Sequence, residues 1–82
     1  MPFFTYILFS ESHDRYYIGH TDRLEERIIE HNSGHTKSTR YGCPWELVFK
    51  REFGTRIEAI RYERYLKSQK SRKFIETLIL TG

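Results

Sequence analysis

The segment from residue 15 to residue 33 constrains the fold more than any other part of the chain. It starts with a short run of strand-forming residues that ends in Tyr17-Ile18-Gly19, and a helix-forming stretch from Thr21 to Ser33 follows. At 3.6 residues per turn, Leu24 and Ile28 mark the apolar stripe of that helix. A strand is therefore expected to lead directly into a helix that buries one face.

Two polar residues lie at the edge of this apolar stripe. On the helical wheel His31 lies only about 20° from Leu24, and Arg27 lies about 60° from it. A residue whose charge must be desolvated usually has a partner or a function. We therefore expect the phenol of Tyr17, the guanidinium of Arg27 and the imidazole of His31 to meet at one place.

The start of the chain predicts an antiparallel hairpin. Residues 3–9 are rich in aromatic and β-branched side chains. Apolar residues occupy both the odd and the even positions of this run, which suits a strand covered on both faces. Residues 15–19 form the second strand. If the turn centres on Glu11-Ser12, Tyr6 lies opposite Tyr17 and both side chains point to the same face.

The first helix has recognisable start and stop residues. Thr21 or Asp22 is the expected N-cap, and Asn32-Ser33-Gly34 is expected to end the helix. Residues 35–44 are expected to form a polar loop.

Three further elements complete the predicted fold. They are a strand over Trp45 to Arg51, a helix capped by Thr55 that runs to about Lys67, and a helix that begins at Ser71. The fold class is α+β, with a three-stranded antiparallel sheet flanked by helices in the order β-β-α-β-α-α. One domain over residues 1–82 is expected.

Composition limits the setting of the protein. Cys43 is the only cysteine among 82 residues, so no intramolecular disulfide is possible and a reducing interior is expected. No apolar run approaches the roughly 20 residues that span a bilayer, and the first residues lack a basic signal region. We expect a soluble, cytoplasmic protein without a membrane partner. Fourteen Lys and Arg against eleven Asp and Glu give a formal net charge of +3, which permits an anionic partner without requiring one.

Several basic residues are candidates for contacts with nucleic-acid phosphates. Two lie in the polar loop and three near the last helix: Lys37, Arg40, Lys70, Arg72 and Lys73. The alternative is that the second group forms an ordinary solvated, lysine-rich helix start.

Glu63 is the acidic residue of interest. In the second predicted helix it projects within about 60° of Ala59, Ile60 and Leu66, so we expect its carboxylate to be partly buried. The alternative is a surface carboxylate that pairs with Arg56 or Lys67.

Taken together, these residues resemble the GIY-YIG nuclease family, and in particular its small stand-alone, single-domain members. The residues that carry the resemblance are Tyr6, Tyr17-Ile18-Gly19, Thr21, Leu24, Arg27, His31, Asn32 and Glu63. The first family motif departs from its usual form, because Thr5-Tyr6-Ile7 keeps only the tyrosine.

The resemblance implies a reaction and a role for each site residue. The reaction is metal-dependent hydrolysis of a nucleic-acid phosphodiester. Tyr17 corresponds to the residue proposed as general base for the attacking water, with Tyr6 beside it. Arg27 corresponds to the arginine that stabilises the transition state, and His31 to a residue that helps to position or deprotonate the reacting groups. Glu63 corresponds to the ligand of one divalent ion. Gly19, Thr21 and Asn32 are expected to be structural residues of the site.

The chemistry of these residue types is consistent with this proposal. A free tyrosine is only about 0.1% ionised at pH 7, so it needs a nearby cation or hydrogen bond to act as a base. One carboxylate with several waters suits Mg²⁺ or Mn²⁺. The four histidines and one cysteine lack the spacing of a structural zinc site, and the absence of an acidic cluster argues against two metal ions.

The sequence leaves three functions open. The first is a structure-selective endonuclease on branched, nicked or single-stranded DNA, acting alone, as a homodimer or in a larger repair complex. The second is an inactive module that only binds nucleic acid, with strong salt dependence. The third is a protein-interaction domain of a DNA-repair complex, with four aromatic residues as candidates unless they pack in the core: Tyr41, Trp45, Tyr62 and Tyr65.

Each site residue also has a purely structural alternative. Tyr6 and Tyr17 are then strand aromatics of the core, and Gly19 marks a sharp turn of the backbone at a strand end. His31 and Asn32 would close the first helix by bonding its last carbonyls.

Overall fold

The computed structural model describes residues 2–34, 37 and 39–82, and it confirms the predicted α+β fold. The elements are, in chain order, β1 (Phe3–Ser10), β2 (Arg15–Thr21), α1 (Leu24–Asn32), the 3₁₀ helix η1 (Arg40–Gly42), β3 (Trp45–Phe53), α2 (Arg56–Ser68) and α3 (Arg72–Thr81). No helix in the described part of the chain is long and apolar enough to cross a membrane.

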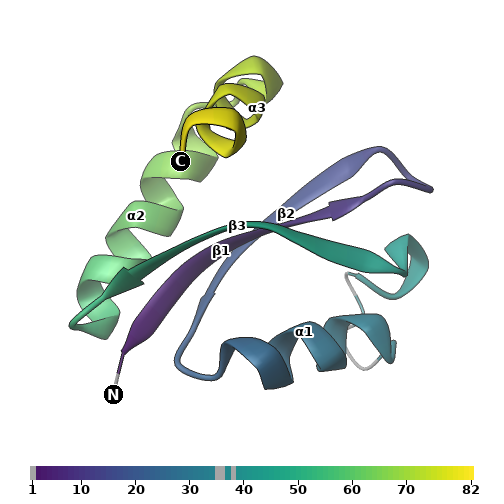
Figure 1. The fold of residues 1–82 in the computed structure, drawn as a ribbon, viewed down its shortest axis with the longest axis horizontal. Helices are drawn as coiled ribbons and strands as arrows, with labels where there is room; N and C mark the ends of the chain where they lie inside the picture. The colour runs from purple at the N-terminus through teal and green to yellow at the C-terminus, as the bar shows by residue number, and fades with distance from the viewer. Residues whose placement is uncertain (1, 35–36, 38) are drawn as a thin grey trace.

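The sheet is antiparallel with the strand order β2-β1-β3, so β1 is the central strand and β2 an edge strand. Helix α1 lies on one side of this sheet, and α2 and α3 lie on the other (Figure 1). Because both faces are covered, Ile7 and Leu8 of β1 are fully buried although they point in opposite directions.

Each side of the sheet has its own apolar cluster. The α2 and α3 side holds Ile7, Phe49, Leu66 and Ile75, and the α1 side holds Tyr6, Leu8 and Trp45. Tyr17 of β2 and Leu24 and Ile28 of α1 pack against the second cluster. The apolar stripe predicted for the first helix is therefore the face that α1 turns toward the sheet.

The predicted hairpin register is wrong by two residues. Tyr17 lies opposite Leu8, and Tyr6 lies opposite Gly19. The strands end at the pair Ser10 and Arg15, so the turn has four residues, the last of which, Asp14, has the positive φ of 52°. Because the shift is an even number of residues, Tyr6 and Tyr17 still point to the same face, as diagonal neighbours.

The predicted N-cap of the first helix is also wrong. Thr21 belongs to β2, and Arg23 occupies the N-cap position without a side-chain cap bond. Thr21 Oγ1 instead accepts a hydrogen bond from the backbone N–H of Arg23, at 3.0 Å. The hydroxyl thus shapes the turn that leads into α1.

The later elements agree with the predictions, with one addition. Thr55 and Ser71 cap α2 and α3 by accepting hydrogen bonds from the backbone N–H groups of Glu58 and Phe74. The addition is η1, inside the segment predicted as loop; residues 35, 36 and 38 of that segment lie outside the described residues.

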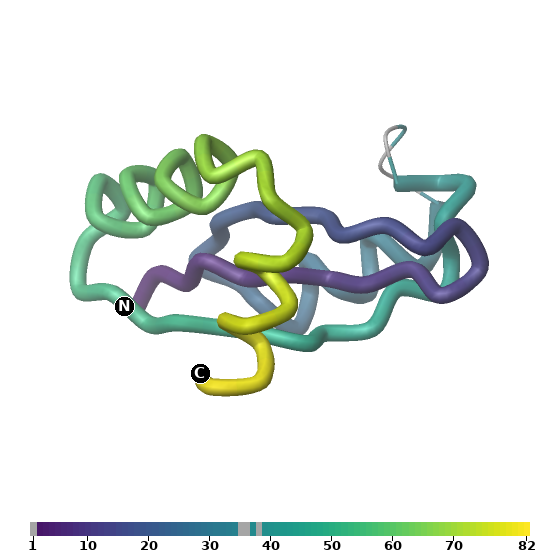
Figure 2. Tube along the Cα trace, turned by 90° about the horizontal axis from the view of Figure 1, so that it is seen from above, coloured from purple at the N-terminus to yellow at the C-terminus, as the bar shows by residue number. Residues whose placement is uncertain are grey.

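The two ends of the sheet differ in what surrounds them. The hairpin turn between β1 and β2 and the segment around η1 lie at one end, whereas α2 begins at the opposite end near the N-terminus (Figures 1 and 2). Tyr17 and Trp45, which lie near the hairpin end of their strands, are thereby brought close to η1.

Candidate functional site

His31 is the centre of the candidate site. Its side chain is fully buried, with Nε2 3.0 Å from the hydroxyl of Tyr6 and Nδ1 2.8 Å from the hydroxyl of Thr39. Burial, and then the charge of Arg27, lower the pKa of His31. The neutral ring has one donor and one acceptor nitrogen, and both are used.

The two tyrosines differ in access to water. Tyr6 is only 1% exposed, whereas Tyr17 is partly exposed. Their ring centroids lie 6.3 Å apart, and the Tyr17 ring lies 4.7 Å from that of His31. Burial, followed by the charge of Tyr17, raises the pKa of Tyr6 to about 12, so Tyr6 stays a neutral phenol near pH 7. Of the two tyrosines, Tyr17 is therefore the one whose side chain is partly open to solvent.

Arg27 lies beside this pair of phenols. Its guanidinium donates to Glu30 Oε1 at 2.9 Å, which is the main reason that the pKa of Arg27 is raised, and Tyr6 and Tyr17 raise it further. In turn, Arg27 lowers the pKa of Tyr6 against the larger effect of burial. The Arg27 side chain is 37% exposed, so part of it is open to solvent.

Glu63 of α2 is partly buried, as predicted, with a side chain only 14% exposed. Its Oε1 is hydrogen-bonded to Nδ1 of His20, and its Oε2 accepts a hydrogen bond from Lys67 Nζ at 2.6 Å. Burial raises the pKa of Glu63, but the hydrogen bonds from Lys67 and His20 outweigh it and leave the pKa lowered. The proposed pairing with Lys67 is therefore confirmed, whereas Arg56 pairs with Asp22 instead.

The candidate site residues lie near one edge of the sheet, some on its α1 side and some on its α2 side. Tyr17 points toward α1, and His20, three residues further along β2, points toward α2. Glu63 nevertheless raises the pKa of Tyr6, so its charge acts on the phenol from the other layer. The structure thus brings Tyr6, Tyr17, Arg27 and His31 together on the α1 side, whereas Glu63 lies on the α2 side and its charge is the smallest of the influences on the pKa of Tyr6.

Gly19 is required by the packing of the two tyrosines. A Cβ atom at this position would lie 2.7 Å from the Tyr6 hydroxyl oxygen and 3.1 Å from Cε1 of Tyr17. Both rings are held by their neighbours, so neither can move aside freely. The glycine lets the Tyr6 hydroxyl pass directly over β2.

We expect Gly19→Ala to destabilise the protein by about 1–3 kcal/mol, because overpacking forces buried rings out of place. The free energy of unfolding in urea measures this effect. The matched control is Gly54→Ala, where the nearest atom to the added Cβ is Glu58 Oε1 at 3.9 Å, and we expect a change within about 0.5 kcal/mol. Equal effects of the two substitutions would contradict the packing described here.

Two of the expected structural residues hold α1 in place. Asn32 donates from Nδ2 to the carbonyl of Trp45 at 3.0 Å and accepts from the N–H of Trp45. The alternative in which His31 and Asn32 bond the last carbonyls of the helix is wrong, because both side chains contact other segments. Thr21 acts one step earlier, at the turn before α1.

The five basic candidates fall into two groups. Lys37 and Arg40 are exposed near η1, while the other three lie at α3 and the turn before it, on the opposite side of the sheet (Figure 1). Lys70 and Lys73 are exposed, but Arg72 pairs with Asp14 and Glu76 and lies over the ring of Tyr16. Arg72 therefore ties α3 to the hairpin turn.

The four candidate interface aromatics do not behave alike. Trp45 is a core residue, with Nε1 bonded to the carbonyl of Thr39 at 2.7 Å, and Tyr62 is partly buried. Tyr41 is 75% exposed and Tyr65 50% exposed. The expectation of core packing is thus correct for Trp45 and for Tyr62, which packs against the apolar cluster on the α2 side, and it is wrong for the exposed Tyr41 and Tyr65.

Two residues of the site were not singled out from the sequence. His20 follows Tyr17-Ile18-Gly19 directly, and strand alternation places it on the same face as Ile18, toward α2. Strand alternation could therefore have predicted from the sequence that His20 faces α2. Thr39 lies in the polar loop, and nothing in the sequence indicates that its hydroxyl is buried against His31.

The low pKa of His31 makes stability depend on pH. Above about pH 6.5 the ring is neutral in both the folded and the unfolded chain; below it, the unfolded chain takes up a proton that the folded protein resists. We expect the wild type to lose stability as the pH falls from 7 to 5, and His31→Gln to lose less over this interval. Urea unfolding at several pH values measures this, with the exposed His13→Gln as control. Identical slopes for wild type and His31→Gln would contradict the assignment.

Comparison with known proteins identifies the class. Residues 2–76 match the family model described as the GIY-YIG catalytic domain, so the chain belongs to the GIY-YIG family. Members of this family are nucleases that act on DNA and generally depend on a divalent metal ion.

Several relatives are similar to this chain. The UPF0213 protein YazA of Bacillus subtilis is 37% identical over 59 residues, which cover 71% of this chain and 60% of YazA. A structure-specific endonuclease subunit SLX1 homolog of Giardia intestinalis is 42% identical over 59 residues, 66% of this chain but only 16% of that protein. The chain thus spans less than two thirds of the length of several relatives.

A solved structure extends the similarity to the whole fold. The solution structure of the UPF0213 protein BH0048 from Bacillus halodurans has 34% sequence identity and a TM-score of 0.62. The match covers 100% of this chain and 86% of that one.

Proposed function

We propose that this chain is a divalent-metal-dependent endonuclease that hydrolyses phosphodiester bonds of DNA and selects its substrate by structure rather than by sequence. The observation that carries the proposal is the partly exposed Tyr17 side chain beside the buried Tyr6–His31 pair, with Arg27 within electrostatic reach. The proposal includes a single nuclease-like domain over residues 1–82 and action on DNA in the cytoplasm.

In this proposal Tyr17 is the general base for the attacking water. Tyr6 is unsuited to that role because it is buried and its pKa is raised to about 12. We assign Tyr6 and His31 to positioning, since their mutual hydrogen bond fixes the wall against which Tyr17 packs. Arg27 contributes fixed positive charge where the phosphate becomes more negative in the transition state.

Glu63 fits the role of ligand to a single Mg²⁺ or Mn²⁺ ion. Its carboxylate stays ionised, its two oxygens already attract the donors His20 and Lys67, and the 55% exposed Lys67 is free to swing away. Within the described residues no group of three or more acidic, histidine or cysteine side chains gathers, so water and phosphate would supply most ligands, as these ions tolerate. When bound, such an ion lowers the pKa of its water and offsets phosphate charge.

The proposed substrates are branched, nicked or single-stranded DNA. The support is the similarity to the Giardia relative, which is a structure-specific endonuclease subunit homolog. Lys37, Arg40, Lys70 and Lys73 are the proposed phosphate contacts. A homodimer or a larger repair complex would enlarge the footprint on DNA, and both belong to the proposal.

The experiment is a cleavage assay on end-labelled branched, nicked, single-stranded and plain duplex DNA. We expect cuts in the first three with Mg²⁺ or Mn²⁺, fewer in the duplex, and none after chelation. Binding that falls steeply with salt but never leads to cleavage would instead support the inactive binding module. Cleavage that survives complete removal of metal would contradict the metal dependence.

A further inference from the structure

We propose that a hollow beside Tyr17, at the hairpin end of the sheet, binds one unpaired base of the DNA strand and so provides the preference for DNA structure. This inference rests on the proposed function and adds a binding site to it. The hollow opens between His13 and Arg15 of the hairpin, Tyr17 and Trp45 of the sheet, and Tyr41 of η1, with a volume of about 270 Å³.

The hollow shares a wall with the candidate active site. The Tyr17 ring contacts His31 on one side, at a centroid distance of 4.7 Å, and meets Trp45 edge-on at 6.3 Å. A base held in the hollow therefore lies against the side chain of Tyr17, the residue to which we assign the general base. One nucleotide in this place would align its neighbouring phosphate with the site.

Tyr41 is an exposed aromatic side chain on a firmly seated turn. Gly42 lies so close to the Trp45 ring that an added Cβ would be 2.3 Å from a ring carbon. The Trp45 Nε1–H also donates to the carbonyl of Thr39, which accepts the N–H of Gly42 as well. These contacts fix η1, so the 75% exposure of Tyr41 comes from the fold rather than from a loose loop.

The charge at the hollow selects nucleic acid over an apolar partner. Arg15 and His13 are exposed at its edge, and among the described residues no ion pair engages Arg15. A tyrosine face beside an unpaired arginine matches a base and its phosphate, because stacking on an aromatic ring tolerates any base and the guanidinium binds the phosphate. A base inside a duplex is already stacked and paired, so it cannot enter.

The test uses single-stranded and duplex oligonucleotides that carry 2-aminopurine, with Ca²⁺ added so that binding is measured without relying on cleavage. For Tyr41→Ala we expect about five- to a hundredfold weaker binding of single-stranded DNA, and little change for the duplex. Tyr41→Phe keeps the aromatic face and should bind as the wild type does. In the wild type, we expect the fluorescence of the probe base to change on binding, and this change to disappear in Tyr41→Ala.

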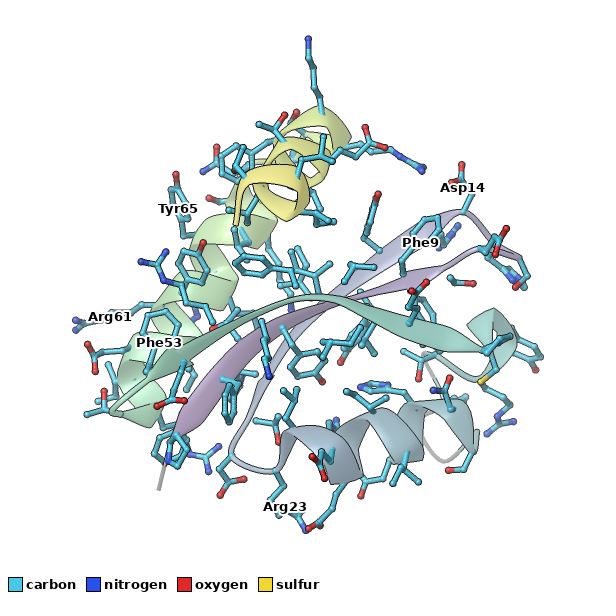
Figure 3. The ribbon with its side chains drawn as sticks, in the orientation of Figure 1. Phe9, Asp14, Arg23, Phe53, Arg61 and Tyr65 are labelled. Carbon is cyan, nitrogen blue, oxygen red and sulfur yellow. The ribbon has the colours of Figure 1, made fainter. Side chains whose placement is uncertain are left out.

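Tyr65→Ala is the matched control, since Tyr65 is also an exposed tyrosine but points outward from α2, far from the hairpin turn at Asp14 (Figure 3). The inference is overturned if Tyr41→Ala and Arg15→Ala leave the preference for single strands intact, or if they weaken duplex binding equally. In either case wild-type cleavage would still support the proposed function. A wild type that neither binds nor cuts any DNA would reject both.

Discussion

Replacing Arg27 with alanine is expected to slow strand cleavage by at least a hundredfold under single-turnover conditions. The guanidinium lies within electrostatic reach of both tyrosines, and its side chain is 37% exposed while it is bound to Glu30. Removing one group that stabilises developing negative charge typically costs about 10²–10³ in rate. We expect Arg27→Lys to recover only part of the rate, because an ammonium cannot form two parallel bonds to phosphate.

The control for this prediction is Arg23→Ala. Arg23 lies at the start of α1, pairs with Asp22 and Glu26, and points away from the sheet (Figure 3). Its loss removes the same charge from the protein without touching the site, so cleavage should stay within a few-fold of the wild-type rate. Similar losses for both variants would mean that Arg27 acts only through net charge.

The second large effect is expected for Tyr17→Phe, which removes one oxygen from the site. General-base catalysis contributes about 10²–10⁴ in rate, and we expect a loss in this range. The fold should be kept, since Tyr17 packs against Tyr6, His31 and Trp45 through its ring.

Tyr65→Phe serves as the control for the hydroxyl group itself, as Tyr65 lies on the outer side of α2 (Figure 3). No effect is expected there. A Tyr17→Phe variant that cuts DNA at the wild-type rate would remove Tyr17 from the role of base, whatever the effect of Arg27→Ala.

Much of the site could be predicted because it follows from helical periodicity. Leu24 and Ile28 fix which side of α1 faces the sheet, and the same 3.6-residue repeat places Arg27 and His31 at the edge of that side. The fold order followed from apolar patterns and from the caps Thr55 and Ser71. These features depend on residues that are close together in the sequence, so they can be predicted from it.

The features that were missed depend on contacts between distant segments. The register of the hairpin was wrong because turn length alone does not fix it, and the positive φ of Asp14 has no clear sequence signal. Thr39 reaches His31, and His20 reaches Glu63, only once β2 has packed beside α2 and η1 has closed on Trp45. Such pairs are set by tertiary packing.

We propose that Glu63 completes a hydrolytic site whose other members lie on the opposite side of the sheet. The most direct measurement compares the cleavage of one labelled, branched DNA by wild type and Glu63→Ala with Mn²⁺ present, after circular dichroism has established that both are folded. We expect the wild type to cut and Glu63→Ala to lose at least a hundredfold in rate. Equal cleavage by the two folded proteins would contradict it.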